Sequence, residues 1–177
     1  MSQFTFRPLR ANDLPLVQVW LNAGPVREWY AQRATSLAEV EAKYLPRIER
    51  AESVSVFVAM VEATSVGLFQ YYAIASFPEY ERAIRARPGW YGVDFFIGDP
   101  ESRGRGYAPT LLAAFEQVVA AGAPNYTALV AGPNPRNEAS IHSLGHAGFV
   151  HRYEVQVPSH EYESIMVRDR APLETAI

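Results

Sequence analysis

The sequence predicts an α/β (α+β) fold: a central mixed, mostly antiparallel sheet of about six to seven strands, flanked by four helices. Apolar runs of strand length alternate with stretches of helical apolar spacing, in the order βααβββαβαββ. Two neighbouring strand-like runs, 53–61 and 66–75, flank a turn short enough for an antiparallel hairpin. One domain over 1–170 accounts for these elements, and 171–177 should form a frayed tail.

The first half of the chain should contain a strand, two helices and the hairpin. Residues 4–9 read as a strand, and Asn12 or Asp13 can cap the helix that follows. The pattern Ser36-x-x-Glu39 is a capping box, which predicts the start of a second helix. Because a proline cannot donate the backbone hydrogen bond, Pro46 should kink or end that helix.

The second half should alternate strands and helices after a loop-like stretch at 76–90. Strands are expected at 91–97, 126–131, 149–157 and 162–169. An apolar stripe predicts a helix over 109–121. Asn134-Pro135 supplies a cap residue and a first-turn proline for the last helix, which should end near Gly148.

Composition excludes several classes of protein. The 177 residues carry a net charge of −3, which provides no basic face for nucleic acid. Without cysteine, the chain can form neither disulfides nor a cysteine nucleophile. No apolar run approaches the roughly 20 residues of a membrane span, and the N-terminus lacks the layout of a signal peptide. We therefore expect a cytoplasmic protein without a nucleic-acid or membrane partner.

The most informative segment is the Arg/Gly-rich turn Arg103–Ala108, which opens into a helix. Backbone N–H groups at the start of a helix have no internal partners, and the helix dipole makes that end positive. Gly104 and Gly106 let the backbone approach an anion closely, and Arg103 and Arg105 add positive charge. Such a turn is typical of a phosphate-binding site.

The spacing Arg103-x-x-Gly106-x-Ala108 resembles the pyrophosphate-binding signature of the GNAT superfamily of acyl-CoA N-acyltransferases, and the order of elements is the one found in GNAT folds. The resemblance implies acetyl-CoA as co-substrate, with its pantetheine arm beside the end of the strand at 91–97. The cofactor-binding residues that it implies are Phe96, Ile97, Gly98, Arg103, Gly104, Arg105, Gly106, Tyr107, Ala108 and Asn137.

Asp94 is the candidate catalytic residue. A carboxylate inside the apolar run Tyr91–Ile97 is costly unless it is paired or faces a cavity. The structural alternative is an aspartate hydrogen-bonded to backbone at a sheet edge. Because ligands gather at the carboxyl ends of strands and this strand leads into the Arg/Gly-rich turn, we expect Asp94 to hold an acceptor ammonium and accept its proton.

The similarity is closest to the aminoglycoside 6′-N-acetyltransferases, a GNAT branch, and it covers roughly residues 5–168. It rests on the segments 36–46, 52–54, 91–100 and 135–141, with Ala147-Gly-Phe149. The resemblance implies that Asp94 engages the acceptor amine and that Trp29 lines the acceptor pocket. Tyr30 and Tyr72 are further candidate substrate-binding residues.

Three positions depart from that family pattern. Leu144 stands where GNAT enzymes often carry the tyrosine that protonates the leaving thiolate. Gly132 stands where the aminoglycoside enzymes carry an aspartate, and 79–87 holds three arginines against two glutamates where some relatives are acidic. Because a polycationic acceptor favours a ring of carboxylates, we expect a small-molecule amine acceptor but poor activity on aminoglycosides.

Without cysteine there is no acyl-enzyme, so the acceptor amine should attack the thioester directly. Water, Ser143, His142 or Tyr107 would then protonate the thiolate in place of the missing tyrosine. Monomer and homodimer both stay open, as do the acyl chain length and the acceptor.

Two other functions stay open. Hydroxamate-siderophore N-acyltransferases carry a similar Ile-Gly-Asp-Pro and Arg-Gly-Arg-Gly run, although a histidine usually stands there in place of Asp94. A non-catalytic CoA- or metabolite-binding module would explain Leu144. No metal is expected, because His142 and His146 have helical ligand spacing but no evident third ligand. A contact of Glu52 or Glu161 with a cationic acceptor stays open, although each is expected on the solvated surface.

Overall fold

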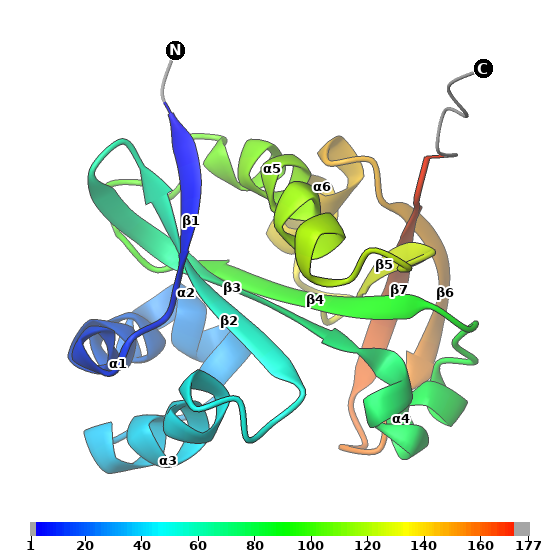
Figure 1. Cartoon of the computed structure of the whole chain (residues 1–177), viewed down its shortest axis with the longest axis horizontal. Helices are drawn as coiled ribbons and strands as arrows, with labels where there is room; N and C mark the ends of the chain where they lie inside the picture. Colours follow the sequence, from blue (N-terminus) through cyan, green and yellow to red (C-terminus); the bar gives the residue numbers. More distant parts are fainter. Residues whose placement is uncertain (1–2, 172–177) are drawn as a thin grey trace.

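The structure is a computed structural model that describes residues 3–171. Its sheet has seven strands in the order β1-β2-β3-β4-β5-β7-β6 (Figure 1). They are β1 (Phe4–Pro8), β2 (Val54–Val61), β3 (Thr64–Ala73), β4 (Trp90–Ile97), β5 (Ala128–Ala131), β6 (Val150–Gln156) and β7 (Tyr162–Asp169). The β4–β5 pair is parallel and the other five pairs are antiparallel, which confirms the predicted sheet. From residue 172 on, the predicted frayed tail lies outside the described residues.

The four predicted helices are present as α1 (Leu14–Asn22), α3 (Leu37–Ile48), α5 (Tyr107–Gly122) and α6 (Glu138–His146). Shorter segments join them: η1 (Ala11–Asp13), α2 (Gly24–Val26), the π-helical η2 (Arg27–Ala31), η3 (Ile74–Ser76) and α4 (Pro78–Ala83). Apolar periodicity cannot reveal helices this short, so the predicted loop at 76–90 turns out to contain α4. Among the described helices, none combines the length and apolar character needed to cross a membrane.

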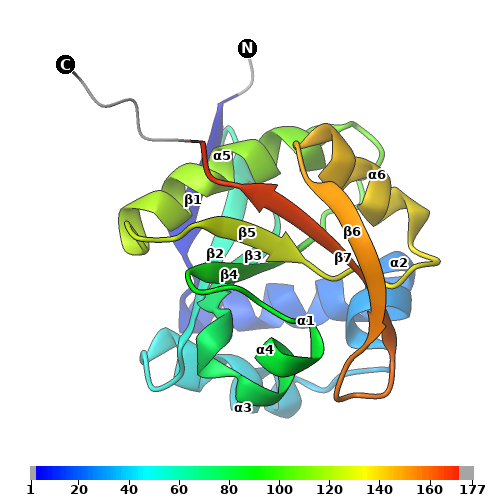
Figure 2. The same ribbon diagram turned by 90° about the vertical axis from the view of Figure 1, so that its right-hand side faces the viewer.

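Helices cover both faces of the sheet, α5 and α6 on one and α1 and α3 on the other (Figures 1 and 2). The alternation of side chains along the hairpin assigns each residue to one face. Phe57 and the paired Phe69 pack on Phe115 of α5, with the Phe69 and Phe115 ring centroids 5.3 Å apart. Their neighbours Val58 and Leu68 are buried in the cluster formed with α1 and α3. Both faces of the sheet are therefore apolar.

Two helix boundaries differ from the sequence prediction. Asn137, rather than Asn134, caps α6 by accepting a hydrogen bond from the Ser140 amide. The Asn134 side chain instead accepts from the Arg136 amide and forms a turn that precedes the helix. Pro46 lies in the last turn of α3, which ends two residues later at Ile48, so the proline marks the end of the helix without breaking it earlier.

The strands β4 and β5 separate where the site begins. β4 pairs with β3 from Tyr91 to Ile97, but it pairs with β5 only from Trp90 to Gly92. Beyond Gly92 the two parallel strands no longer share hydrogen bonds, and a cavity opens between them. Asp94 lies two residues past Gly92, in the part of β4 that no longer pairs with β5.

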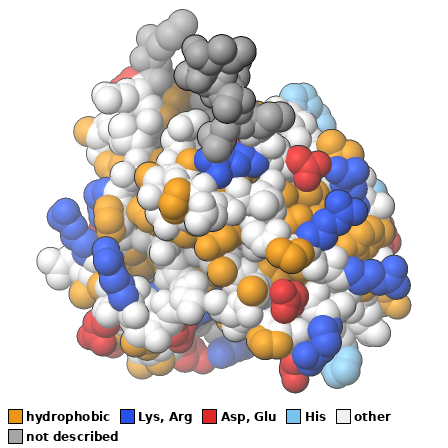
Figure 3. Space-filling view, turned by 45° about the vertical axis from the view of Figure 1, so that its right-hand side comes forward, with side chains coloured by type: hydrophobic (Ala, Val, Ile, Leu, Met, Phe, Trp, Pro, Cys, Tyr) orange, Lys and Arg blue, Asp and Glu red, His pale blue; other side chains and the backbone are white. Residues whose placement is uncertain are grey.

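Acidic and basic side chains are interspersed on the face of the molecule shown in Figure 3. On this face they do not form the continuous basic stripe that nucleic-acid binding requires.

Candidate active site

The main cavity has a volume of about 1220 Å³ and lies between the separated strands β4 and β5. We call it the central pocket. Its walls come from η2, α3, β3, β4, the start of α5, the segment 131–137, α6 and the start of β7. One end meets the Arg/Gly-rich turn, and the other meets η2, α3 and β7. The first is the donor half and the second the acceptor half, with Asp94 between them.

The donor half is built by the turn before α5. Gly106 is the N-cap residue of α5 with φ of 74°, and Gly104 has φ of 73°, both in the left-handed region that favours glycine. A Cβ at either glycine would meet open space, so the backbone is accessible to a ligand. The Nε atom of Arg103 is buried and has no hydrogen-bond partner among the described residues. An anion on this turn would supply one.

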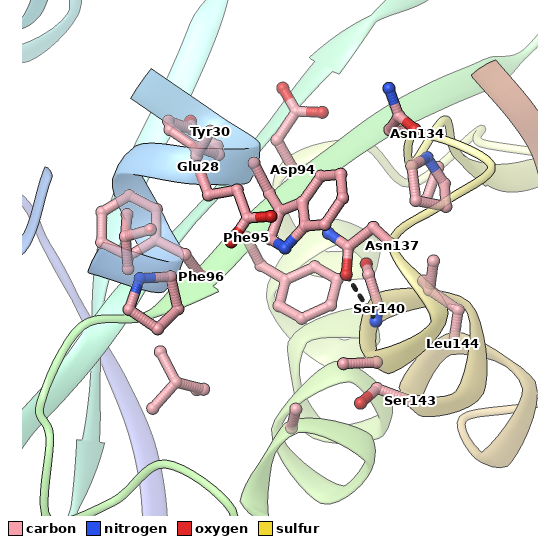
Figure 4. Close-up of a pocket in the computed structure, with 18 of the residues that line it drawn as sticks. Glu28, Tyr30, Asp94, Phe95, Phe96, Asn134, Asn137, Ser140, Ser143 and Leu144 are labelled. Carbon is pink, nitrogen blue, oxygen red and sulfur yellow. Dashed lines mark hydrogen bonds between the residues drawn. The ribbon is translucent and has the colours of Figure 1, made fainter. Parts of the chain in front are cut away.

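Helix α6 faces the same half of the pocket. Figure 4 shows Asn137, Ser140, Ser143 and Leu144 on one side of the cavity, across from Tyr30, Glu28 and Phe96. Because the Oδ1 atom of Asn137 already accepts from the Ser140 amide, its side-chain NH₂ remains as a donor. Leu144 is fully buried and lines the cavity, so the place of the family tyrosine is apolar here.

Each side chain that the sequence suggests as a thiolate acid lies at the pocket. Ser143, His142 and Tyr107 all line it, on the α6 and α5 side. Ser143 directly precedes Leu144, so along the chain its hydroxyl is the nearest replacement for a tyrosine at position 144. The histidine pair His142 and His146 gains no third partner, because no cluster of three metal-ligating side chains occurs in the described residues.

Asp94 is held by a chain of hydrogen bonds that runs across the sheet to α3. Gln70 of β3, directly opposite in the strand register, donates its Nε2 to Asp94 Oδ2 at 2.8 Å. Arg47 Nη1 donates to the Oε1 of the same amide at 3.1 Å, and Arg47 Nε binds Glu52 at 2.9 Å. Since Arg47 can only donate, it fixes which end of the Gln70 amide faces Asp94.

Burial raises the pKa of Asp94, whereas the Gln70 hydrogen bond and the charges of Lys43 and Arg47 lower it. The net direction is upward, as expected for a carboxylate that is removed from solvent. A raised pKa makes this carboxylate a better proton acceptor than an exposed aspartate. Asp94 lies on an inner strand and is bonded to a side chain, not to backbone at a sheet edge, and its catalytic role stays a prediction.

Aromatic rings form one wall of the acceptor half. Tyr30 of η2 packs edge-to-face on Phe96, with centroids 4.8 Å apart. The Nζ atom of Lys43 lies 5.2 Å from the Tyr30 ring centroid, and the same pocket lowers the pKa of Lys43, chiefly by burial. Trp29 lines the pocket as well, and the guanidinium of Arg136 lies 6.0 Å from its ring. The place of Trp29 and Tyr30 is consistent with a role in substrate binding.

Carboxylates also line the acceptor half. The sequence alone left a contact of Glu161 with a cationic acceptor open but did not indicate Glu28 or Glu163. Glu28, Glu161 and Glu163 all line the pocket. Glu161, which we expected on the solvated surface, remains exposed but accepts from Gln32 Nε2 at 2.9 Å and so joins the residue before β7 to the residue after η2. The Tyr80 hydroxyl donates to Glu163 Oε2 at 2.8 Å. Burial and the nearby Asp94 raise the pKa of Glu163 to about 7, against the effect of the Tyr80 hydrogen bond.

Three of the residues predicted to bind cofactor or substrate do not line the central pocket. Gly98 packs against the ring of Trp20 and donates its amide to Val66, so it serves the core. Arg105 is exposed on the turn, outside the pocket wall. Tyr72 packs edge-to-face on Phe77 and fills the space over Gly92.

The arginine-rich segment 79–87 also lies away from the pocket. Arg85 and Arg87 line a separate smaller cavity with Trp90 and Tyr153, on the β6 side of the molecule. Tyr80 touches the acceptor half only through its hydroxyl on Glu163. These arginines therefore do not oppose a cationic acceptor by direct contact, which removes one reason for expecting poor activity on aminoglycosides.

Comparison with known proteins identifies the family. The family model described as an acetyltransferase (GNAT) domain matches residues 10–157, which include the turn, Asp94 and α6. The chain belongs to the GNAT acetyltransferase family. This confirms the predicted fold and class of enzyme, a CoA-dependent N-acetyltransferase, and the comparisons do not favour the siderophore or non-catalytic alternatives.

The relatives of this GNAT protein act on amines. The chain is 27% identical over 156 residues to aminoglycoside N(6′)-acetyltransferase type 1 of Klebsiella pneumoniae, and the match covers 87% of this chain and 77% of the relative. Its fold matches the crystal structure of aminoglycoside acetyltransferase AAC(6′)-Ib in complex with coenzyme A and kanamycin, with a TM-score of 0.85, 27% identity and 95% of each chain covered. Spermidine N-acetyltransferase of Vibrio cholerae shares the fold at 19% identity, with a TM-score of 0.71 and 94% and 95% of the two chains covered.

Proposed function

We propose that this GNAT protein transfers the acetyl group of acetyl-CoA to a primary amine of a small cationic acceptor related to amino sugars. The observation that carries the proposal is the single pocket that holds both an anion-binding helix start and a carboxylate with a raised pKa. The aminoglycoside acetyltransferase AAC(6′)-Ib, to which the chain is similar, forms a complex with coenzyme A and kanamycin.

The residues present fit the co-substrate. The open backbone at Gly104 and Gly106 and the unpartnered Nε of Arg103 suit a pyrophosphate, and Asn137 adds a side-chain donor. The unpaired edge of β4 beyond Gly92, next to Phe96 and Ile97, suits an extended amide-containing arm. Acetyl-CoA supplies the thioester, and the chain supplies the site that orients it.

The chemistry at the acceptor half follows from the position of Asp94. Its carboxylate binds the acceptor ammonium, takes one proton and leaves a neutral amine with a free electron pair. That nitrogen attacks the thioester carbonyl, a C–N bond forms, and the C–S bond breaks to release the thiolate of CoA. Ser143, His142, Tyr107 or water gives a proton to the sulfur and is replenished by the second proton of the nitrogen, and Asp94 releases the first proton to solvent.

A thiol-release assay tests this function. The protein is mixed with acetyl-CoA and, in separate reactions, kanamycin, spermidine, N6-hydroxylysine or no acceptor, and free CoA thiol is followed with time. We expect release above the no-acceptor rate with kanamycin, together with an acetylated product of the corresponding mass. Release with none of the acceptors, or thiol without acetylated product, would contradict the proposed function.

A further inference from the structure

The carboxylate of Glu163 occupies the volume that a side chain at position 132 would take. A Cβ on Gly132 would lie 2.0 Å from Glu163 Oε2 and 2.7 Å from its carboxyl carbon, distances that real contacts do not reach. The backbone φ of Gly132 is not in the left-handed region, so nothing else in its conformation demands glycine. Gly132 and Glu163 are therefore a matched pair: the small residue on the segment after β5 makes room for the carboxylate from β7.

Two contacts fix where this carboxylate lies. The amide of Ser164 donates to the Pro133 carbonyl at 2.9 Å and holds the start of β7 against the end of β5. The Tyr80 hydroxyl donates to Glu163 Oε2 at 2.8 Å, and among the described residues the second oxygen, Oε1, accepts no hydrogen bond. Glu163 is partly buried and lines the central pocket, so one of its oxygens is held and the other is free for a ligand.

No cation of the described residues neutralises Glu163. Its ionisable neighbours are Tyr72, Tyr80, Asp94 and Glu161, which are phenols and carboxylates. Of the cations that line the acceptor half, Lys43 and Arg47 belong to α3, which packs on β2, whereas Glu163 belongs to β7 on the other side of β4 in the sheet order. The third, Arg136, lies over the ring of Trp29. Arg47 is already paired with Glu52 and Gln70. The acceptor half therefore has a cationic wall on α3 and an uncompensated anionic wall on β7.

We propose that Glu163 binds a second ammonium group of the acceptor while Asp94 binds the amine that is acetylated. The preferred acceptors are then small compounds with at least two amino groups. The proposal rests on the proposed function and adds the substrate class. A second cation stabilises the complex because it removes the repulsion between two partly buried carboxylates and satisfies the free oxygen of Glu163.

A matched set of acceptors tests the proposal. Diaminoalkanes from propane to octane are compared with amino alcohols of the same chain length, in which a hydroxyl replaces the second ammonium. We expect the best diamine to exceed its amino alcohol in kcat/KM by roughly 10- to 100-fold, the usual effect of a charged hydrogen bond. Glu163→Gln, which retains an acceptor for Tyr80, should remove that preference by raising KM for the diamine, with the amino alcohol unchanged.

Two further variants separate charge from fold. Glu154→Gln changes the same functional group on the exposed part of β6 and should retain the diamine preference. Gly132→Asp combined with Glu163→Ala returns a carboxylate to the same volume from the other strand and should restore the preference lost in Glu163→Gln. Melting temperatures of all three confirm that folded protein is compared.

The outcomes distinguish the two proposals. Acetylation of diamines and amino alcohols with equal efficiency, unchanged in Glu163→Gln, would overturn the second-ammonium site and leave the acetyltransferase function standing. Failure of the wild-type protein to acetylate either series, kanamycin or spermidine would overturn the proposed function itself. An equal loss on both series in Glu163→Gln would assign Glu163 to the fold or to the reacting amine, and would also overturn the site.

Discussion

The two halves of the central pocket are built in different ways. The donor half comes mainly from one continuous stretch, from the end of β4 through the Arg/Gly-rich turn into α5, with α6 opposite. The acceptor half brings together η2, α3, β3, β4 and β7. One of its contacts, between Gln32 and Glu161, joins residues that are 129 positions apart in the sequence. Backbone conformation makes the first site, and long-range side-chain contacts make the second. A short sequence pattern can encode only the first kind.

The largest effect is expected from removing the charge of Asp94, which lies between the two halves. Asp94→Asn should lower turnover by about 10²–10⁴-fold, because the proton acceptor is lost, while acetyl-CoA binding stays nearly unchanged. Turnover, acetyl-CoA affinity and melting temperature are measured on one preparation. Asp169→Asn, the same change on the exposed end of β7, is the control and should keep full activity. A destabilised but fully active Asp94→Asn protein would make Asp94 a structural residue and leave the acceptor half without a catalytic group.

The complementary test disables the donor half. Gly106→Val places a β-branched residue at a φ of 74°, where it is strained by roughly 1–2 kcal/mol, and its side chain enters the open space of the turn. Wild-type protein should gain roughly 5–10 °C in melting temperature with acetyl-CoA at a hundredfold excess over Kd. The variant should lose this gain. Gly145→Ala in α6, which also faces open space but at an ordinary φ, should keep it. An undiminished gain in Gly106→Val would place the co-substrate elsewhere.

How far the sequence could predict the molecule follows the same division. Alternating and helical apolar patterns located the seven strands and four long helices, because burial on two faces requires those periods. The positive-φ glycines before α5 were visible in a six-residue pattern. Glu163, in contrast, is one glutamate in an ordinary strand, and its site exists only because the end of β5 lies beside it. The only local sign was the unexpected glycine at 132.

The same limit explains the error about the arginine-rich segment. Residues 79–87 were weighed by composition, but their side chains point to two different places once α4 has formed. Tyr80 reaches Glu163 in the central pocket, whereas Arg85 and Arg87 line the cavity near β6. The charge of a segment predicts the charge of a site only when all its side chains face that site.

A third prediction concerns the chain of hydrogen bonds behind Asp94. Arg47→Met removes the donor that orients Gln70 and a positive charge that lowers the pKa of Asp94. We expect kcat to fall by about 2- to 10-fold, the cost of one hydrogen bond, and the acidic limb of the rate profile to move to higher pH. The pH dependence of kcat/KM for one acceptor measures the second effect. Arg152→Met, on the exposed β6 strand, is the control, and an unmoved profile in Arg47→Met would remove Arg47 from the positioning of Asp94.

The smallest expected effect is the pH dependence of stability due to Glu163. Its pKa of about 7 in the folded protein exceeds the ordinary value of 4.5, so the folded state binds this proton more tightly than the unfolded state. The protonated group therefore contributes stability that is fully present below about pH 4.5 and is lost as the pH rises through about 7. Glutamine at 163 carries no proton to lose. The difference in melting temperature between wild type and Glu163→Gln should change by roughly a few degrees over this range, because the melting temperature of wild type falls relative to that of the variant as the pH rises. A difference that is constant with pH would mean that Glu163 is ionised throughout, as for a carboxylate facing open solvent, and would weaken the case for an acceptor half that needs a second cation.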